Sequence, residues 1–111
     1  AGVRLLRQAD HSVNLPLPGP VGPRFRHVIL YSRDNCPLCD EALELLRQYA
    51  AYLPTIVLID ISRDEDLTSQ HGTWIPVVEF DGRIRFRGRV SEPLLRRMIR
   101  MAAPVTGLNP H

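Results

Sequence analysis

The hydrophobic positions change their spacing several times along the chain, and each change marks a predicted element. An apolar stretch at residues 26–31 predicts a strand, and residues 37–50 predict an amphipathic helix that packs on it. The apolar positions of that helix are Leu38, Ala42, Leu45, Leu46 and Tyr49. Residues 54–61 form a β-branched run that is too continuous for a surface strand and therefore predicts a buried one. These elements make a βαβ unit, with parallel strands and a right-handed crossover.

A short helix and a hairpin are predicted next. Residues 62–65 have the pattern of a capping box that opens a helix, and Gly72 should end it. Two strands should follow at residues 77–80 and 83–86. The Asp-Gly pair that separates them is the strongest short signal for a two-residue hairpin turn.

The last predicted element is a helix that begins after Ser91. Serine is a favoured N-cap residue, and Pro93 suits the first helical turn. The apolar stripe of this helix comprises Leu94, Leu95, Met98, Ile99 and Met101. The predicted order is therefore β-α-β-α-β-β-α, which is an α/β fold.

Composition divides the chain into one domain and two appendages. A length of 111 residues, 44% of them hydrophobic, suits a single small domain, which we place at residues 25–103. Residues 1–24 are rich in proline, which predicts a flexible N-terminal extension, and residues 104–111 form a tail. The extension is either a disordered tail or the remnant of an organelle transit peptide. We expect its deletion to leave the folded core and its thiol chemistry intact.

The overall charge does not indicate any particular class of binding partner. A formal net charge of +2 is too balanced to indicate nucleic acid or a membrane surface. No apolar run approaches the roughly 20 residues that span a bilayer, and the start lacks the apolar core of a signal peptide. Two cysteines are too few for a secreted disulfide scaffold. We expect a cytoplasmic monomer, with an organelle such as the mitochondrion as the alternative location.

The main candidate chemistry is the Cys-x-x-Cys pair at Cys36 and Cys39. It follows the first predicted strand and opens the first helix, where unpaired N–H groups and the helix dipole stabilise a thiolate. Open α/β sheets place their sites at this end of a strand. We expect Cys36 to be exposed and nucleophilic and Cys39 to face inward and resolve the mixed disulfide. Pro37 suits the first helical position, where its missing N–H costs nothing.

A zinc site is a weaker interpretation of the same pair. Zinc needs two further ligands, and no two histidines stand at finger-like spacing. The candidates are His11, His27, His71 and His111. We therefore expect no metal and no bound cofactor.

Charged neighbours of the pair act in opposite directions. Arg33 either adds positive charge beside a Cys36 thiolate or is simply solvated. The carboxylates of Asp34, Asp40 and Glu41 disfavour a thiolate, although acidic residues in a first turn stabilise the helix itself. The sequence does not determine which influence is larger.

A second candidate segment, Trp74-Ile75-Pro76, precedes the hairpin. Pro76 either marks the start of a strand or forms a cis bond that lets the Ile75 backbone pair with an incoming extended chain. Trp74 is either a core aromatic residue or one lip of a substrate groove.

Residues 25–103 resemble the thioredoxin fold in its short glutaredoxin form, and most closely the small uncharacterised glutaredoxin-like family. The residues that carry this resemblance are the run Cys-Pro-Leu-Cys-Asp-Glu-Ala at 36–42, Trp-Ile-Pro-Val at 74–77 and Gly-Arg-Val at 88–90. The resemblance implies a central four-stranded mixed sheet flanked by helices, a cis Pro76 that faces the dithiol, and a nucleophilic Cys36. It also implies that Arg33 contacts a glutathione carboxylate and that the Ile75 backbone pairs with the glutathione cysteinyl group.

Two departures from the glutaredoxin pattern bear on the substrate. Trp74 stands where glutaredoxins usually have Thr, and the segment after the hairpin lacks their usual Gly-Gly-x-x-Asp. Both strengthen the case for a protein disulfide or dithiol as partner, with glutathione as the other co-substrate. The first functional hypothesis is a thiol–disulfide oxidoreductase, and the second is a binding or adaptor module that keeps the fold without catalysis.

Overall fold

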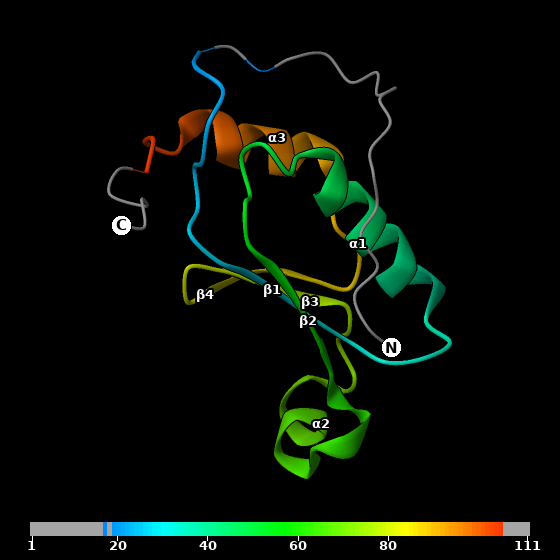
Figure 1. The fold of residues 1–111 in the computed structure, drawn as a ribbon. Coiled ribbons are helices and arrows are strands. Elements are labelled where there is room, and N and C mark those ends of the chain that lie inside the picture. The colour runs from blue at the N-terminus through cyan, green and yellow to red at the C-terminus, as the bar shows by residue number, and fades with distance from the viewer. Residues whose placement is uncertain (1–16, 18, 106–111) are drawn as a thin grey trace.

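The computed structural model describes residues 17 and 19–105 (Figure 1). The element order confirms the predicted β-α-β-α-β-β-α pattern, with one additional 3-10 helix, η1. The elements are β1 (Val28–Ser32), α1 (Pro37–Gln48), β2 (Ile56–Asp60), η1 (Ile61–Arg63), α2 (Glu65–His71), β3 (Val77–Phe80), β4 (Arg83–Arg87) and α3 (Glu92–Met101).

The four strands form one mixed sheet in the order β2-β1-β3-β4. β1 pairs with β2 in parallel, as the βαβ unit predicts, and antiparallel with β3, which continues antiparallel into β4. Helices α1 and α3 lie over one face of the sheet, and α2 lies beyond the end at which β2 finishes (Figure 1). This is the thioredoxin-like α/β fold.

The core lies between the sheet and the two helices that cover it. The sheet contributes Val28 and Leu30, and the facing helix α1 contributes Ala42 and Leu46. Helix α3 adds Leu95 and Ile99, which are four residues apart and therefore point the same way. Leu94 and Met101, two other members of the predicted apolar stripe, do not pack in the core and are 53% and 69% exposed.

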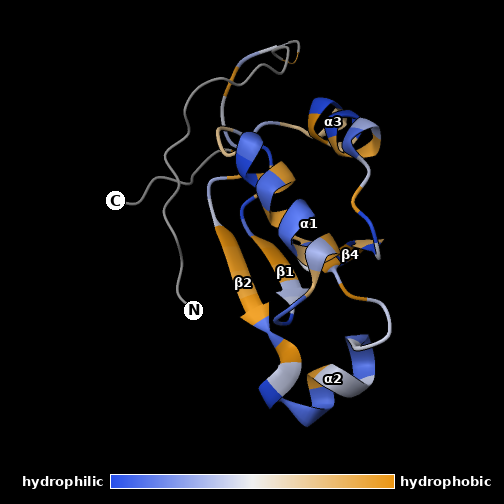
Figure 2. Cartoon of the chain, turned by 90° about the vertical axis from the view of Figure 1, so that its right-hand side faces the viewer, coloured by the Kyte–Doolittle hydropathy of each residue, from blue (hydrophilic) through white to orange (hydrophobic). Residues whose placement is uncertain are grey.

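The prediction that residues 54–61 form a buried strand is also wrong. β2 is an edge strand with β1 as its one neighbour, so its outer edge has no strand beside it among the described residues. Val57 and Leu58 are 40% and 41% exposed, although Figure 2 shows β2 as one of the most hydrophobic segments of the chain. A continuous apolar run therefore reports strand formation here but not a central position.

Helix α2 begins two residues later than the capping-box pattern predicts. Ser62 lies within η1, whose cap is Asp60, and the cap of α2 is Asp64. The Asp64 carboxylate accepts a hydrogen bond from the Leu67 N–H at 3.0 Å. Gly72 ends the helix as predicted, in a right-handed conformation. The single aspartate provides what the Ser-x-x-Glu box was expected to provide.

The hairpin turn forms as predicted. Asp81 and Gly82 have φ angles of +50° and +88°, the conformation of a type I′ turn. The Asp81 carboxylate also accepts hydrogen bonds from the backbone N–H groups of Arg26 and His27, at 2.9 and 2.8 Å. The turn therefore anchors the segment that leads into β1.

The end of the predicted N-terminal extension is attached to the domain. Leu17 and Arg24 are both buried, and Leu17 belongs to the core. Arg24 Nη1 donates to the backbone carbonyls of Ile99 and Ala102, both at 3.0 Å, and Nη2 donates to the Pro20 carbonyl at 3.0 Å. Deletion of residues 1–24 would remove both of these contacts, and the expectation that the folded core and its thiol chemistry survive that deletion stays a prediction. The division of the chain at residue 24 stays a prediction.

Replacing Arg24 tests this attachment. We expect Arg24→Ala to lower the free energy of unfolding by about 2 kcal/mol, because three hydrogen bonds from a charged donor are lost. Urea denaturation measures the change, and Arg87→Ala, at an exposed position of β4, is the matched control. Equal stabilities of the two variants would show that the Arg24 contacts contribute nothing.

Candidate active site

The two cysteines lie at the N-terminus of α1, at the end of the loop that follows β1. Cys36 is the N-cap residue, in an extended conformation, and Pro37 occupies the first helical turn. The Cys36 sulfur accepts a hydrogen bond from the Cys39 N–H at 3.1 Å, and the Cys36 carbonyl accepts one from the Asp40 N–H at 3.0 Å. Asn35 adopts a positive φ of 57°, which small polar side chains tolerate, and it reverses the chain into the helix. The first sulfur thus lies against the N–H of Cys39 in the first turn of the helix.

Cys36 and Cys39 form a disulfide, with Cα atoms 5.2 Å apart. Cys39 is buried, whereas Cys36 is partly exposed. A molecule that approaches from solvent therefore meets the Cys36 sulfur first. Because the bond closes a loop of only one helical turn, it contributes little by restricting the unfolded chain.

The pairing of β1 with β3 brings the Trp74–Pro76 segment to the same end of the sheet. Tyr31, near the end of β1, lies opposite Val77, which begins β3 directly after Pro76. The Ile75–Pro76 peptide bond is cis, and Pro76 is fully buried. Trp74 is 55% exposed, so it is not a core side chain.

Gly88, which follows β4, is hydrogen-bonded to the Trp74–Pro76 segment. Its N–H lies 2.8 Å from the carbonyl oxygens of both Trp74 and Pro76, and it donates to both. Its φ of +87° is a conformation that glycine adopts without strain. The positive φ explains why a glycine suits this position, which the sequence marked only as part of a family motif, and the two N–H contacts join the end of β4 to the Trp74–Pro76 segment.

The side chain of Arg33 is hydrogen-bonded to the backbone at the end of α2. Its Nη2 donates to the Gly72 carbonyl at 3.3 Å, which connects the loop after β1 to the end of α2.

On α1 itself, Glu41 makes an exposed ion pair with Arg89 at 3.9 Å. Such pairs contribute little to stability. One carboxylate near the dithiol is therefore partly compensated by an arginine from the loop after β4.

A polar cluster that no sequence pattern predicted lies on the face of β1 opposite to Val28 and Leu30. The Tyr31 hydroxyl donates to a Glu79 carboxylate oxygen at 3.1 Å, and the Tyr31 ring lies 4.5 Å from the ring of the buried His71. Burial raises the pKa of Tyr31, and the hydrogen bond and negative charge of Glu79 raise it further. No sequence motif links these residues, because their contact depends on the β1–β3 register and on the position of α2.

Neither a metal-binding cluster nor a membrane-spanning helix occurs among the described residues. Residues 17 and 19–105 contain no group of three His, Cys, Asp or Glu side chains placed to hold a metal ion. None of the helices in this part of the chain has the length and apolar character needed to cross a bilayer.

Comparison with known proteins relates most of the chain to one family. The family described as Glutaredoxin-like domain (DUF836) matches residues 27–100. A solved structure, the structural genomics target protein XcR50 from X. campestris, shares 34% sequence identity and superposes with a TM-score of 0.58. The match covers 68% of this chain and 99% of that one. No curated protein matches the chain significantly.

The Tyr31–Glu79 contact predicts a shift in an alkaline titration. We expect Glu79→Gln to lower the pKa of Tyr31 toward its usual 10.0, because a negative charge and a strong acceptor are removed. The ring chemical shifts of Tyr31 report the titration, and Glu65→Gln, on exposed α2, is the control.

The sign of the linked stability follows from this shift. In the unfolded chain Tyr31 ionises first, so its contribution is fully present below pH 10 and is lost as the pH rises through the folded-state pKa. An unchanged Tyr31 titration in Glu79→Gln would contradict the assignment.

Proposed function

Because this chain belongs to the glutaredoxin-like domain (DUF836) family, we propose that it is a thiol–disulfide oxidoreductase with Cys36 and Cys39 as its redox couple. One observation carries the proposal: the partly exposed Cys36 is the N-cap of α1, and its sulfur accepts the Cys39 N–H. In the reduced protein the same N–H and the positive end of a 12-residue helix would stabilise a Cys36 thiolate.

The proposed reduction of a substrate disulfide has two exchange steps. The Cys36 thiolate attacks one substrate sulfur, the substrate S–S bond breaks, and the released thiolate takes a proton from water. Cys39 then loses its proton and attacks the Cys36 sulfur, which breaks the mixed disulfide and releases the second substrate thiol. Two electrons have passed to the substrate, and Cys36–Cys39 is a disulfide. Two molecules of a thiol such as glutathione, or one protein dithiol, would reduce it again.

The surroundings of the dithiol favour a disulfide in a polypeptide as substrate, with a glutathione-mixed disulfide as the other candidate. Trp74 offers a broad exposed ring at the end of the sheet where α1 begins. An aromatic surface of this kind can cover the side chains of an extended peptide. Arg33 is the candidate contact for a substrate carboxylate, although it would first have to leave the Gly72 carbonyl. The Ile75 backbone is the candidate partner for the peptide backbone of either substrate.

Single-cysteine variants test the redox couple. We expect Cys36→Ser to abolish disulfide reduction, because the attacking sulfur is absent. Cys39→Ser should retain the first step and accumulate a mixed disulfide at Cys36, because no second thiol resolves it. Mass spectrometry of Cys39→Ser after incubation with a glutathionylated peptide and with a disulfide-containing protein shows which substrate class reacts faster.

Full activity in Cys36→Ser would contradict the redox proposal. The variant with both Cys36→Ser and Cys39→Ser tests the adaptor hypothesis. An adaptor would keep its partner in that variant, whereas an oxidoreductase loses turnover. Circular dichroism of each variant establishes that the fold is intact.

The pH dependence of alkylation tests the activation of Cys36. We expect iodoacetamide to alkylate Cys36 of the reduced protein with a midpoint below the value of about 8.5 for a free cysteine, because the helix N-terminus favours the thiolate. Mass spectrometry separates Cys36 from Cys39. Alkylation midpoints of about 8.5 at both cysteines would mean that the negative charges of Asp34, Asp40 and Glu41 offset the stabilisation of the thiolate by the helix N-terminus.

A further inference from the structure

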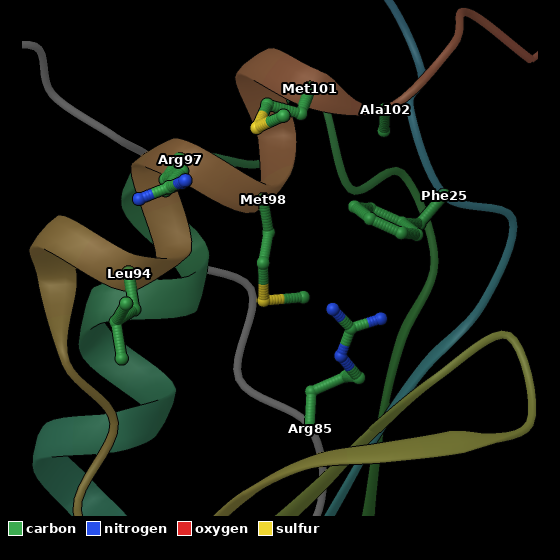
Figure 3. A pocket seen from close by; sticks show the side chains of 7 residues that line it. All are labelled: Phe25, Arg85, Leu94, Arg97, Met98, Met101 and Ala102. Carbon is green, nitrogen blue, oxygen red and sulfur yellow. The ribbon is translucent and has the colours of Figure 1, made fainter.

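A groove lies between α3 and β4, away from the dithiol. Its volume is about 480 Å³, within the range of ligand sites in proteins. The Met98 side chain extends from α3 toward the guanidinium of Arg85, and the Phe25 ring lies beside them (Figure 3). Leu94, Arg97, Met101 and Ala102 complete the lining. The groove is therefore apolar in its middle and carries two arginines.

A β-bulge places Arg85 at the groove. Val78 pairs with Phe86, but the next residue, Glu79, pairs with Ile84, so Arg85 is the extra residue in β4. A bulge redirects the side chain that it inserts. In Figure 3 the Arg85 guanidinium points from β4 toward α3. A regular hairpin would not have this extra residue.

The groove side of α3 carries a second apolar stripe. Leu94, Met98 and Met101 recur at i, i+4 and i+7, over about 10 Å of helix. Leu94 and Met101 lie apart from Leu95 and Ile99, which fill the core, whereas Met98 is partly buried and packs against that core. Two of the three side chains in the stripe are mostly exposed, and methionine adapts to the shape of a partner. Spacing of this kind matches the apolar face of another helix.

Positive charge surrounds the stripe. Residues 83–101 contain seven arginines and one carboxylate, whereas the rest of the chain contains seven arginines and eleven carboxylates. The one carboxylate, Glu92, accepts a hydrogen bond from the Tyr49 hydroxyl. No ion pair or side-chain hydrogen bond joins the guanidinium group of Arg85 or of Arg97 to any residue in the described part of the chain. Two guanidinium groups at the groove are therefore available to an acidic ligand.

We propose that this groove is the docking site for an acidic amphipathic helix of a partner protein. The apolar face of that helix covers Leu94, Met98 and Met101, and its carboxylates pair with Arg85 and Arg97. A second copy of this chain does not fit, because a two-fold contact through α3 would place the same arginines opposite one another.

No residue of the dithiol loop or of α1 lines the groove, and its Phe25 end lies at the end of β1 opposite to Cys36. Phe25 precedes β1, whereas Cys36 follows it. A strand of five residues separates its two ends by roughly 17 Å. A helix bound in the groove therefore leaves Cys36 open to solvent. The inference does not rest on the proposed function.

The direct test measures binding of a designed peptide to the full chain. The probe is a 15-residue helical peptide with Leu at i, i+4 and i+7 and Glu on both sides of that stripe (roughly four turns of helix). The control peptide has Lys at every Glu position. Fluorescence anisotropy gives the affinities, and backbone amide NMR shifts locate the contact. We expect the acidic peptide to bind at least about tenfold more tightly, with shifts at Leu94, Met98 and Met101 and with an affinity that falls as salt is added.

Variants at the groove separate docking from general charge attraction. We expect Arg85→Glu and Arg97→Glu each to weaken the acidic peptide at least about fivefold, and Leu94→Ser to weaken it without changing the salt dependence. The matched controls are Arg63→Glu in η1 and Val21→Ser, both exposed and outside the groove. The variant with Cys36→Ser and Cys39→Ser should bind normally, which keeps this test independent of the redox proposal.

Three results would overturn the inference. One is equal binding of the acidic and basic peptides, and another is an equal effect of Arg63→Glu and Arg97→Glu. The third is saturation of the groove by dodecanoate or by a single-stranded oligonucleotide at concentrations at which the acidic peptide does not bind. That result would assign the groove to a small amphiphilic anion or to nucleic acid instead.

Discussion

β1 pairs with a neighbouring strand on each side, and this pairing positions both the crossover helix and the two segments of the candidate site. Parallel pairing with β2 requires a crossover, and α1 is that crossover. Antiparallel pairing with β3 then fixes the other side of the site, because Tyr31 lies opposite Val77. The loop that carries Cys36 and the segment that ends at Pro76 thus reach the same end of the sheet. The strand pairing brings the two segments together, and no sequence motif in either segment does so.

The two ends of the sheet differ in chemistry. One end, where α1 begins, carries the disulfide, the exposed Trp74 ring and the Arg33–Gly72 contact. At the other end α3 finishes against Phe25, and the Arg24 guanidinium binds the last carbonyls of that helix. A buried cation is stable there because backbone carbonyls satisfy it. The small net charge of the chain conceals an uneven distribution of charge. Arginines gather on β4 and α3, while most carboxylates lie elsewhere in the chain.

Local sequence signals succeeded where one segment contains all the groups that make the contact. The Asp81-Gly82 turn, the Ser91 cap and the position of Cys36 at the start of a helix are of this kind. The capping of α2 shows the limit, because Asp64 and the predicted Ser62 stand two residues apart and both are able to cap a helix. The formation of η1 from Ile61 to Arg63 decided between them.

Periodicity, turn residues and motif spacing act over short distances along the chain, so the order of the elements, the family resemblance and the place of the two cysteines were predictable without the structure. The tertiary structure decided which strand is at the edge. It also decided that Arg24 is buried and that the bulge at Arg85 faces α3. Each of these depends on a partner far away in sequence, such as Ile99 for Arg24. An apolar run or a single arginine has the same local pattern in either environment, so only the fold assigns its role.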